Sequence, residues 1–158
     1  MSEKPGWALL AYRLPREPST PRIAVWRKLK RLGVAQLGDG LVALPLDART
    51  REALDWLANE IAEAGGEASV WLAQPGTQAQ ERSLAEAMAA AVAAEYAALI
   101  ADATSAAAAP PASRRRTLAR LRRELQRIRR RDYFPPPERE RAEAALAQLG
   151  ATLVEAPA

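Results

Sequence analysis

Residues 34–73 read VAQLGDGLVALPLDARTREALDWLANEIAEAGGEASVWLA, and this stretch decides the fold. Gly38-Asp39-Gly40 separates two short β-prone runs, a pattern typical of a hairpin turn. Asp47 can cap the helix that follows, and Gly65-Gly66 can end it before a last apolar run. The predicted order is therefore strand, strand, helix, strand, over Val34–Leu37, Leu41–Leu46, Ala48–Ala64 and Ala68–Ala73.

The segment before this stretch adds one strand and one helix. Trp7–Tyr12 is a short apolar run with two aromatic residues, which favours a buried strand. Pro21 suits the first turn of a helix over Arg22–Leu32, and Gly33 ends it. The order β-α-β-β-α-β predicts an α+β protein with a ferredoxin-like domain over residues 1–75, in which two helices cover one face of a four-stranded antiparallel sheet.

The rest of the chain, residues 76–158, predicts a helical extension of three helices packed on that domain. A long alanine-rich helix begins after Thr77 and runs to about Ala103, and Thr104–Ser113 is expected to be a linker. An arginine-rich helix follows within Arg114–Phe134, and three prolines end it because proline lacks an amide donor. A short C-terminal helix, Glu138–Leu149, is expected to stop at Gly150, with a short strand or frayed end after it.

The arginine-rich helix has two different faces. Leu118, Leu121, Leu125 and Ile128 recur at spacings of three and four, which is the repeat of one helical face. We call this face the apolar stripe. The opposite face, which we call the arginine ridge, carries five arginines over roughly 21 Å of helix axis. They are Arg116, Arg120, Arg123, Arg127 and Arg130.

The charge distribution favours an anionic partner for the arginine ridge. Arg114–Arg131 carries ten arginines against Glu124, or +9, which leaves −5 on the remainder of a chain of net charge +4. Guanidinium groups donate paired hydrogen bonds to phosphate oxygens at any cellular pH, so DNA is the leading partner. A second basic patch is predicted on the first helix, from Arg22, Arg27, Lys28, Lys30 and Arg31.

Several other roles fit the same arginines. They could form a solvated face, or one neutralised by the acidic remainder of the chain. Arginines that converge in a pocket could instead bind a small tetrahedral oxyanion. The ridge could also dock on an acidic protein surface. A homodimer through a sheet edge or a helix is a further possibility, and the narrow apolar stripe argues against a membrane partner.

Composition argues against most catalytic chemistry. The sequence contains no cysteine and no histidine, which removes the commonest metal ligands and general base. Turn, cap and surface positions account for the carboxylates Asp39, Asp47, Glu52 and Asp55. We therefore expect no catalytic residues, no metal and no cofactor. Core packing is the favoured role of the tryptophans, with base stacking as the alternative; they are Trp7, Trp26, Trp56 and Trp71.

Localisation is expected to be cytoplasmic. The start of the chain, MSEKPGW, lacks the apolar region of a secretory signal. No apolar run reaches the ~18 residues of a membrane span.

The N-terminal stretch GWALLAYRLPREPSTPRIAVWRKLKRLGVAQLGDGLVALP resembles the N-terminal domain of the chromate-resistance regulator ChrB family. A strand ends in Leu-Pro, a helix with the pattern Ser-x-x-Arg-x-x-x-Trp-Arg follows, and a hairpin ends in Leu-Pro. An arginine-rich helix then runs into Asp132-Tyr133-Phe134-Pro135 and is followed by a Glu/Ala-rich helix. The resemblance covers about Trp7–Leu149.

The resemblance implies a ferredoxin-like core related to the Cas2-like domain of phenylacetate-type repressors. It also implies a role in chromate-responsive transcriptional control, with DNA contact by this N-terminal region. Together with the composition, this predicts a non-enzymatic, DNA-binding regulator. The alternative is a sensor of chromate or another oxyanion that acts through a partner protein. Full-length members of this family are expected to continue into a second, C-terminal domain, whereas this sequence ends at Ala158. Cas2-like nucleases hold a metal on an Asp soon after the first-strand aromatic residue. Here that neighbourhood is Tyr12-Arg13-Leu14-Pro15, and a cation at Arg13 opposes metal binding, so nuclease activity is not expected.

Overall fold

The computed structural model describes residues 6–154 and divides into two compact units, one up to Leu84 and one from Ala85. The boundary falls inside one long helix, α3, Gln78–Ala106. The first five residues of the MSEKPGW segment, on which the expectation of no secretory signal depends, lie outside the described residues.

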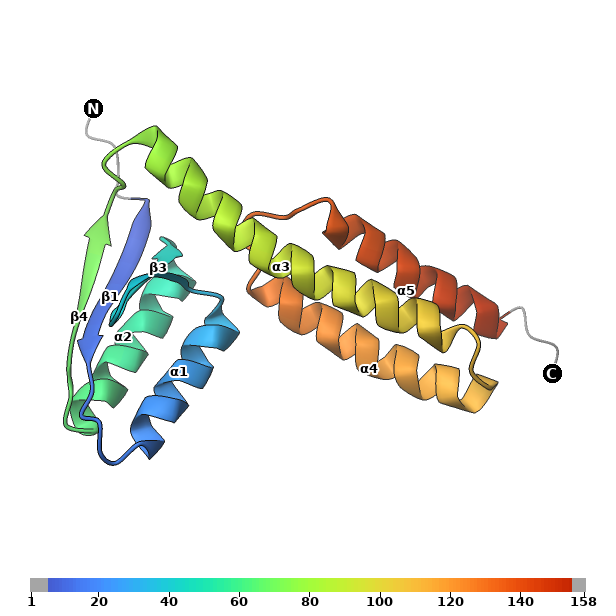
Figure 1. Ribbon diagram of the computed structural model, residues 1–158, viewed down its shortest axis with the longest axis horizontal. Coiled ribbons are helices and arrows are strands. Elements are labelled where there is room, and N and C mark those ends of the chain that lie inside the picture. The colour runs from blue at the N-terminus through green and yellow to red at the C-terminus, as the bar shows by residue number, and fades with distance from the viewer. Residues whose placement is uncertain (1–5, 155–158) are drawn as a thin grey trace. The chain divides into compact units, whose positions relative to one another are not determined.

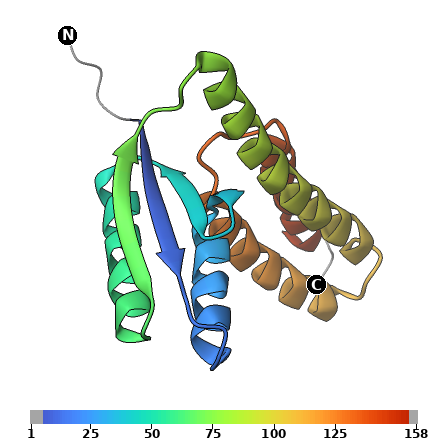
Figure 2. The same ribbon diagram turned by 60° about the vertical axis from the view of Figure 1, so that its left-hand side comes forward.

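The first unit has the predicted ferredoxin-like architecture. Its four strands form one antiparallel sheet in the order β2-β3-β1-β4, and the two helices cover one face of it (Figures 1 and 2). The elements are β1 Trp7–Arg13, α1 Thr20–Leu32, β2 Ala35–Gly38, β3 Leu41–Pro45, α2 Ala48–Glu63 and β4 Glu67–Ala73. The predicted βαββαβ order is confirmed, with each boundary within two residues of the expected one.

Local sequence signals explain where the helices of this unit begin and end. Asp47 and Thr50 form a capping box at the start of α2: Thr50 N donates to Asp47 Oδ1 at 2.7 Å, and Asp47 N donates to Thr50 Oγ1 at 3.0 Å. At the end of α1, Gly33 adopts a left-handed φ of 75° and its amide donates to Lys30 O at 3.1 Å.

The core of the first unit lies between the sheet and its two helices. Leu10 in the central strand β1 pairs with Val42 of β3 and Val70 of β4, so these three side chains share the face that the helices cover. Leu10 and Val42 are buried there. The helices contribute the buried side chains Val25, Leu29, Leu54, Leu57 and Ile61.

The second unit consists of the C-terminal part of α3 with α4, Pro111–Arg130, and α5, Glu138–Val154, which lie side by side (Figures 1 and 2). The whole apolar stripe of α4 is buried in their shared core, as the sequence predicted. Its neighbours in this core include Val92, Tyr96 and Leu99 of α3 and Leu146 and Leu149 of α5.

Two predicted boundaries in this unit are wrong. The linker expected over Thr104–Ser113 shrinks to residues 107–110, because α3 continues to Ala106 and α4 begins at Pro111. Proline is compatible with the first helical position, where its missing amide has no intrahelical acceptor, so Pro111 starts the helix rather than delaying it. The last helix does not stop at Gly150 but continues to Val154, which excludes the strand considered there.

Gly150 therefore lies inside a helix, and Gly150→Ala is expected to stabilise the protein by about 0.5–1 kcal/mol, because glycine costs this much relative to alanine in a helix interior. A Cβ there would lie 3.4 Å from Arg122 Nη2 and 3.6 Å from Leu118 Cδ2, and the former belongs to a movable side chain. Urea denaturation measures the change. A loss of stability would mean that α4 and α5 pack too closely at this point for a methyl group.

Within residues 6–154, α3 is a helix long and apolar enough to cross a membrane by length and composition, with a mean hydropathy of 1.5 in its most apolar window. Much of this apolarity comes from alanine. Length and composition alone are weak evidence for a span, because core helices of soluble proteins pass the same test. The larger side chains Val92, Tyr96 and Leu99 of this helix are buried in the core of the second unit.

Candidate nucleic-acid interface

All five side chains of the arginine ridge are exposed on the face of α4 opposite the buried apolar stripe. The periodicity of the helix explains this directly, because the four stripe residues occupy the core-facing side and leave the other side to solvent. The exposure of Arg116, Arg120, Arg123, Arg127 and Arg130, which the sequence left open, is therefore determined by the packing of the second unit.

Other arginines near α4 have structural contacts. Arg131, which is 15% exposed, donates from Nε to Glu95 Oε2 of α3 at 3.0 Å. The pKa of Arg131 is raised, first by this hydrogen bond and against the effect of burial. Arg114 donates to Thr152 Oγ1 of α5 at 2.9 Å, so contacts to both neighbouring helices hold α4 in place.

Acidic neighbours compensate only part of the ridge. Glu124 lies 2.6 Å from Arg127 on the same helix, an exposed pair of small net value. Asp102 of α3 reaches Arg120 at 4.0 Å, the outer limit of an ion pair. Among the described residues, Arg123 has no acidic side chain within ion-pair distance. All five ridge arginines nevertheless remain exposed to solvent.

A buried polar cluster supports the turn at the C-terminal end of α4. The Tyr96 hydroxyl donates to Asp132 Oδ2 at 2.7 Å, and Arg139 Nη1 lies 3.7 Å from the same oxygen. Burial, together with this hydrogen bond and the nearby carboxylate charge, raises the pKa of the Tyr96 phenol. The Asp-aromatic-Phe-Pro turn predicted from the sequence is therefore tied to both α3 and α5 through Asp132.

The patch predicted on the first helix is not a continuous basic surface. Lys28 forms a two-oxygen ion pair with Glu60 of α2, at 2.7 and 2.8 Å. Lys30 Nζ lies 4.5 Å from the centre of the Trp26 ring, a cation–π contact. Arg27 and Arg31 are exposed, while Arg22 extends toward a pocket. Packing against α2 and Trp26 thus separates the five cations into different environments.

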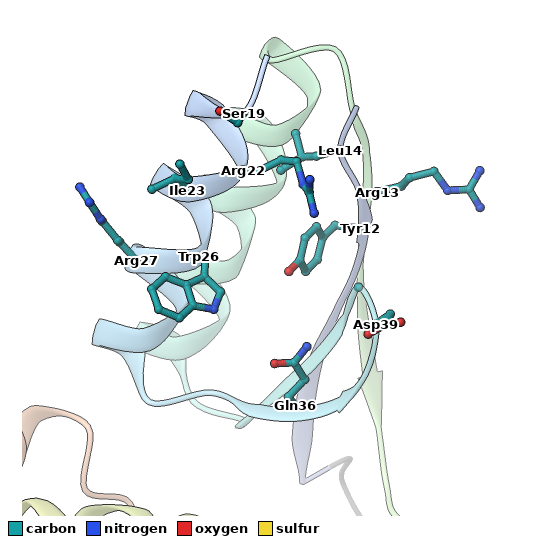
Figure 3. Close-up of a pocket in the computed structure, with 11 residues that line it drawn as sticks. Tyr12, Arg13, Leu14, Ser19, Arg22, Ile23, Trp26, Arg27, Gln36 and Asp39 are labelled. Carbon is teal, nitrogen blue, oxygen red and sulfur yellow. The ribbon is translucent and has the colours of Figure 1, made fainter. Parts of the chain in front are cut away.

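A pocket that the sequence did not reveal lies between α1, the end of β1 and the β2–β3 hairpin, and has a volume of about 880 Å³. Figure 3 shows Tyr12, Arg22, Trp26 and Gln36 directed toward a common space, whereas Arg13 and Arg27 point away from it. The guanidinium groups of Arg13, Arg22 and Arg27 therefore do not converge on one point in this pocket, as they would have to for binding one oxyanion together.

The hairpin turn closes one side of this pocket through a contact that needs glycine. The Tyr12 amide donates to Gly40 O at 2.8 Å, and Gly40 has a left-handed φ of 69°. A Cβ at position 40 would lie 2.3 Å from the Tyr12 carbonyl oxygen, a distance that real side chains do not adopt. Gly40 thus lets the hairpin lie directly against β1 where Tyr12 enters the pocket. Burial raises the pKa of the Tyr12 phenol, while the Arg22 charge opposes that rise.

The expectation that the tryptophans pack in the core is wrong for three of the four. Trp7 is buried and donates from Nε1 to Glu81 Oε1 at 3.2 Å. Trp26, Trp56 and Trp71 are 53, 68 and 60% exposed. Leucine, isoleucine and valine from the sheet and helices fill the core instead, so these three indoles lie at its surface.

Three of the four carboxylates considered for catalysis have the structural roles expected from their positions. Asp47 caps α2, Glu52 accepts from Trp56 Nε1 at 3.4 Å, and Asp55 lies 3.9 Å from Arg51. Over residues 6–154 no group of three or more acidic side chains is close enough to hold a metal ion. The described surface presents two features to a ligand: the exposed arginine ridge of α4 and the aromatic pocket of the first unit.

Comparisons with known proteins identify one family. The family model described as Protein ChrB, N-terminal, matches residues 22–109. A curated protein from Cupriavidus metallidurans, named Protein ChrB, is 31% identical over 159 aligned positions that include 96% of this chain. The chain spans about half the length of that relative, 48%. No solved structure matches.

Proposed function

Because this chain belongs to the ChrB N-terminal family, we propose that it is a non-enzymatic, DNA-binding regulator of chromate resistance that holds nucleic-acid phosphates on its arginine ridge. Such a role requires a cytoplasmic location, where DNA is accessible. The relative's name and the family match support the chromate assignment, and the charge and exposure of α4 support the DNA partner.

One observation carries the DNA assignment: five exposed arginines follow one face of a helix whose opposite face is fully buried. The burial of the apolar stripe prevents the helix from rotating, so the ridge is presented as a fixed row of charges about 21 Å long. A preorganised row loses less side-chain and backbone freedom on binding than a flexible basic tail would. Guanidinium groups also suit phosphate geometry, since each offers parallel N–H donors.

The ridge would position the protein on DNA without reading its sequence. Contacts to phosphates carry no base information, and the ridge consists of arginines with exposed alanine and glutamine between them. Two duplexes of the same length and unrelated sequence are therefore expected to bind the isolated chain with similar affinity.

The salt dependence of duplex binding tests this proposal. If all five arginines of the ridge each neutralise one phosphate, the logarithm of the association constant should fall against the logarithm of the salt concentration with a slope of roughly −4.5. Fluorescence anisotropy with a labelled duplex, between low and physiological salt, measures it. Absence of binding at low salt, or a slope near zero, would contradict phosphate binding by the ridge.

A further inference from the structure

The pocket of the first unit combines three chemical features that one class of ligand would use together. Its interior presents an exposed indole, a phenol, a carboxamide and a guanidinium, from Trp26, Tyr12, Gln36 and Arg22 (Figure 3). Its volume of about 880 Å³ lies within the range of organic-ligand sites and is far larger than a tetrahedral oxyanion requires.

The aromatic part of the pocket suits a planar ring. Trp26 is 53% exposed, although tryptophan side chains are on average largely buried. Lys30 covers one face of its ring at 4.5 Å, which holds the indole and leaves only its other face to a ligand. Tyr12 enters the same space from β1. Exposed aromatic rings on a basic surface are typical of proteins that stack on nucleobases.

The polar groups of the pocket suit an anion attached to such a ring. Of the three arginines that line the pocket, Arg22 is the one directed inward, and the lining includes one carboxylate, that of Asp39. Ser19, at the N-terminus of the 13-residue helix α1, also lines the pocket, its hydroxyl makes no capping hydrogen bond, and the first turn of α1 contains no acidic residue. Arg22 and this positive helix end would attract a phosphate to the same rim.

Gln36 offers the third feature, recognition of a ring edge. A carboxamide presents one acceptor and two donors, a combination that pairs with the edge of a nucleobase. In the structure its Nε2 is 3.5 Å from Gly38 O, a contact too long to fix the amide firmly. Gln36 therefore remains able to turn toward a bound base.

We propose that this pocket binds an unpaired nucleotide, with the base against Trp26 and Tyr12, its edge at Gln36, and its phosphate at Arg22 and the N-terminus of α1. The ligand chemistry is the same for a free nucleoside monophosphate and for one nucleotide of a single strand. The inference does not depend on duplex binding by the arginine ridge, since all of its residues belong to the first unit.

Titration of the full chain with AMP, adenosine, inorganic phosphate and a short oligo-dA tests the proposal, with calorimetry as the readout. AMP or the oligonucleotide should bind at least tenfold more tightly than adenosine or phosphate, because only they offer base and phosphate together. Tighter binding of AMP would identify a free nucleotide as the ligand, and tighter binding of the oligonucleotide a single strand. Phosphate binding as tightly as AMP would overturn the proposal in favour of an oxyanion site, and no binding by any probe would also overturn it.

Two substitutions with matched controls assign the site. Trp26→Leu should weaken AMP binding roughly 5- to 150-fold, the range of one base-stacking contact, whereas Trp56→Leu, at an exposed tryptophan outside the pocket, should not. Arg22→Gln should weaken binding of AMP more than binding of adenosine, while Arg31→Gln on the same helix should affect neither. If Trp26→Leu does not fold, Gln36→Leu replaces it. Equal effects of the pocket and control substitutions would overturn the assignment.

Discussion

Replacing Arg120, Arg123 and Arg127 with glutamine is expected to weaken duplex DNA binding roughly 500-fold at about 0.1 M salt. Each lost phosphate contact removes about 0.9 from the magnitude of the log–log salt slope, so three losses reduce it by about 2.7. The 500-fold figure assumes that these three arginines make no electrostatic contribution to DNA binding at about 1 M salt. It follows when the slope change of about 2.7 is applied from there to about 0.1 M salt. Anisotropy titrations of the wild-type and triple-substituted chains measure both quantities.

A second triple substitution provides the control. Arg16, Arg82 and Arg141 are exposed arginines outside the ridge, and replacing them with glutamine changes the net charge by the same three units. This variant should keep most of the affinity for DNA and nearly the whole salt slope. The reason is that the local row of charges, rather than the net charge of the protein, binds the phosphates. Equal losses in the two triple variants would show that the ridge is not the contact surface.

Leu121→Ala is expected to destabilise the second unit by about 3 kcal/mol, within the range of about 2–5 kcal/mol for a buried leucine. Leu121 is 1% exposed and lies in the core shared by the three helices. The truncation removes apolar contacts and leaves a cavity that the neighbouring side chains fill only in part. Urea denaturation followed by far-UV circular dichroism measures the loss, since this unit consists of helices and all four tryptophans belong to the other.

Arg123→Ala is the matched control for this experiment. It lies two residues further along the same helix, on the exposed face, and its removal should change the free energy of unfolding by no more than about 0.5 kcal/mol. A loss below about 1 kcal/mol for Leu121→Ala would contradict the burial of the apolar stripe.

The two experiments separate the two faces of α4. Loss of ridge arginines should reduce affinity for DNA at nearly unchanged stability, whereas loss of Leu121 should reduce stability at nearly unchanged affinity when the protein is still folded. Loss of both properties in both variants would mean that the two faces do not have separate roles.

Much of the architecture was predictable because its signals are local. The Asp47 cap, the Gly33 and Gly40 turns and the order of strands and helices depend on residues close together in the chain. The same holds for the two faces of α4, which follow from a repeat of 3.6 residues. The errors arose where a local rule had an exception: Pro111 begins a helix, and Gly150 lies inside one.

The candidate sites were less predictable because they depend on contacts between distant residues. Lys28 is paired because Glu60 lies opposite it on α2, and Arg131 because Glu95 lies on α3. The pocket was missed because Tyr12, Trp26 and Gln36 are separated in the chain and only the sheet topology brings them together. The available signal was Trp26 among the cations of the first helix, and core packing was the preferred interpretation of that tryptophan.

By itself, the sequence determined the βαββαβ order, the family resemblance and the presence of an arginine ridge opposite an apolar stripe, because these depend on residue order and helical periodicity. The tertiary structure decided which arginines remain accessible: packing against α3 and α5 engages Arg114 and Arg131 and leaves the ridge exposed. The aromatic pocket also depends on the tertiary structure alone, because the distances between side chains far apart in the sequence depend on how the sheet and its helices pack.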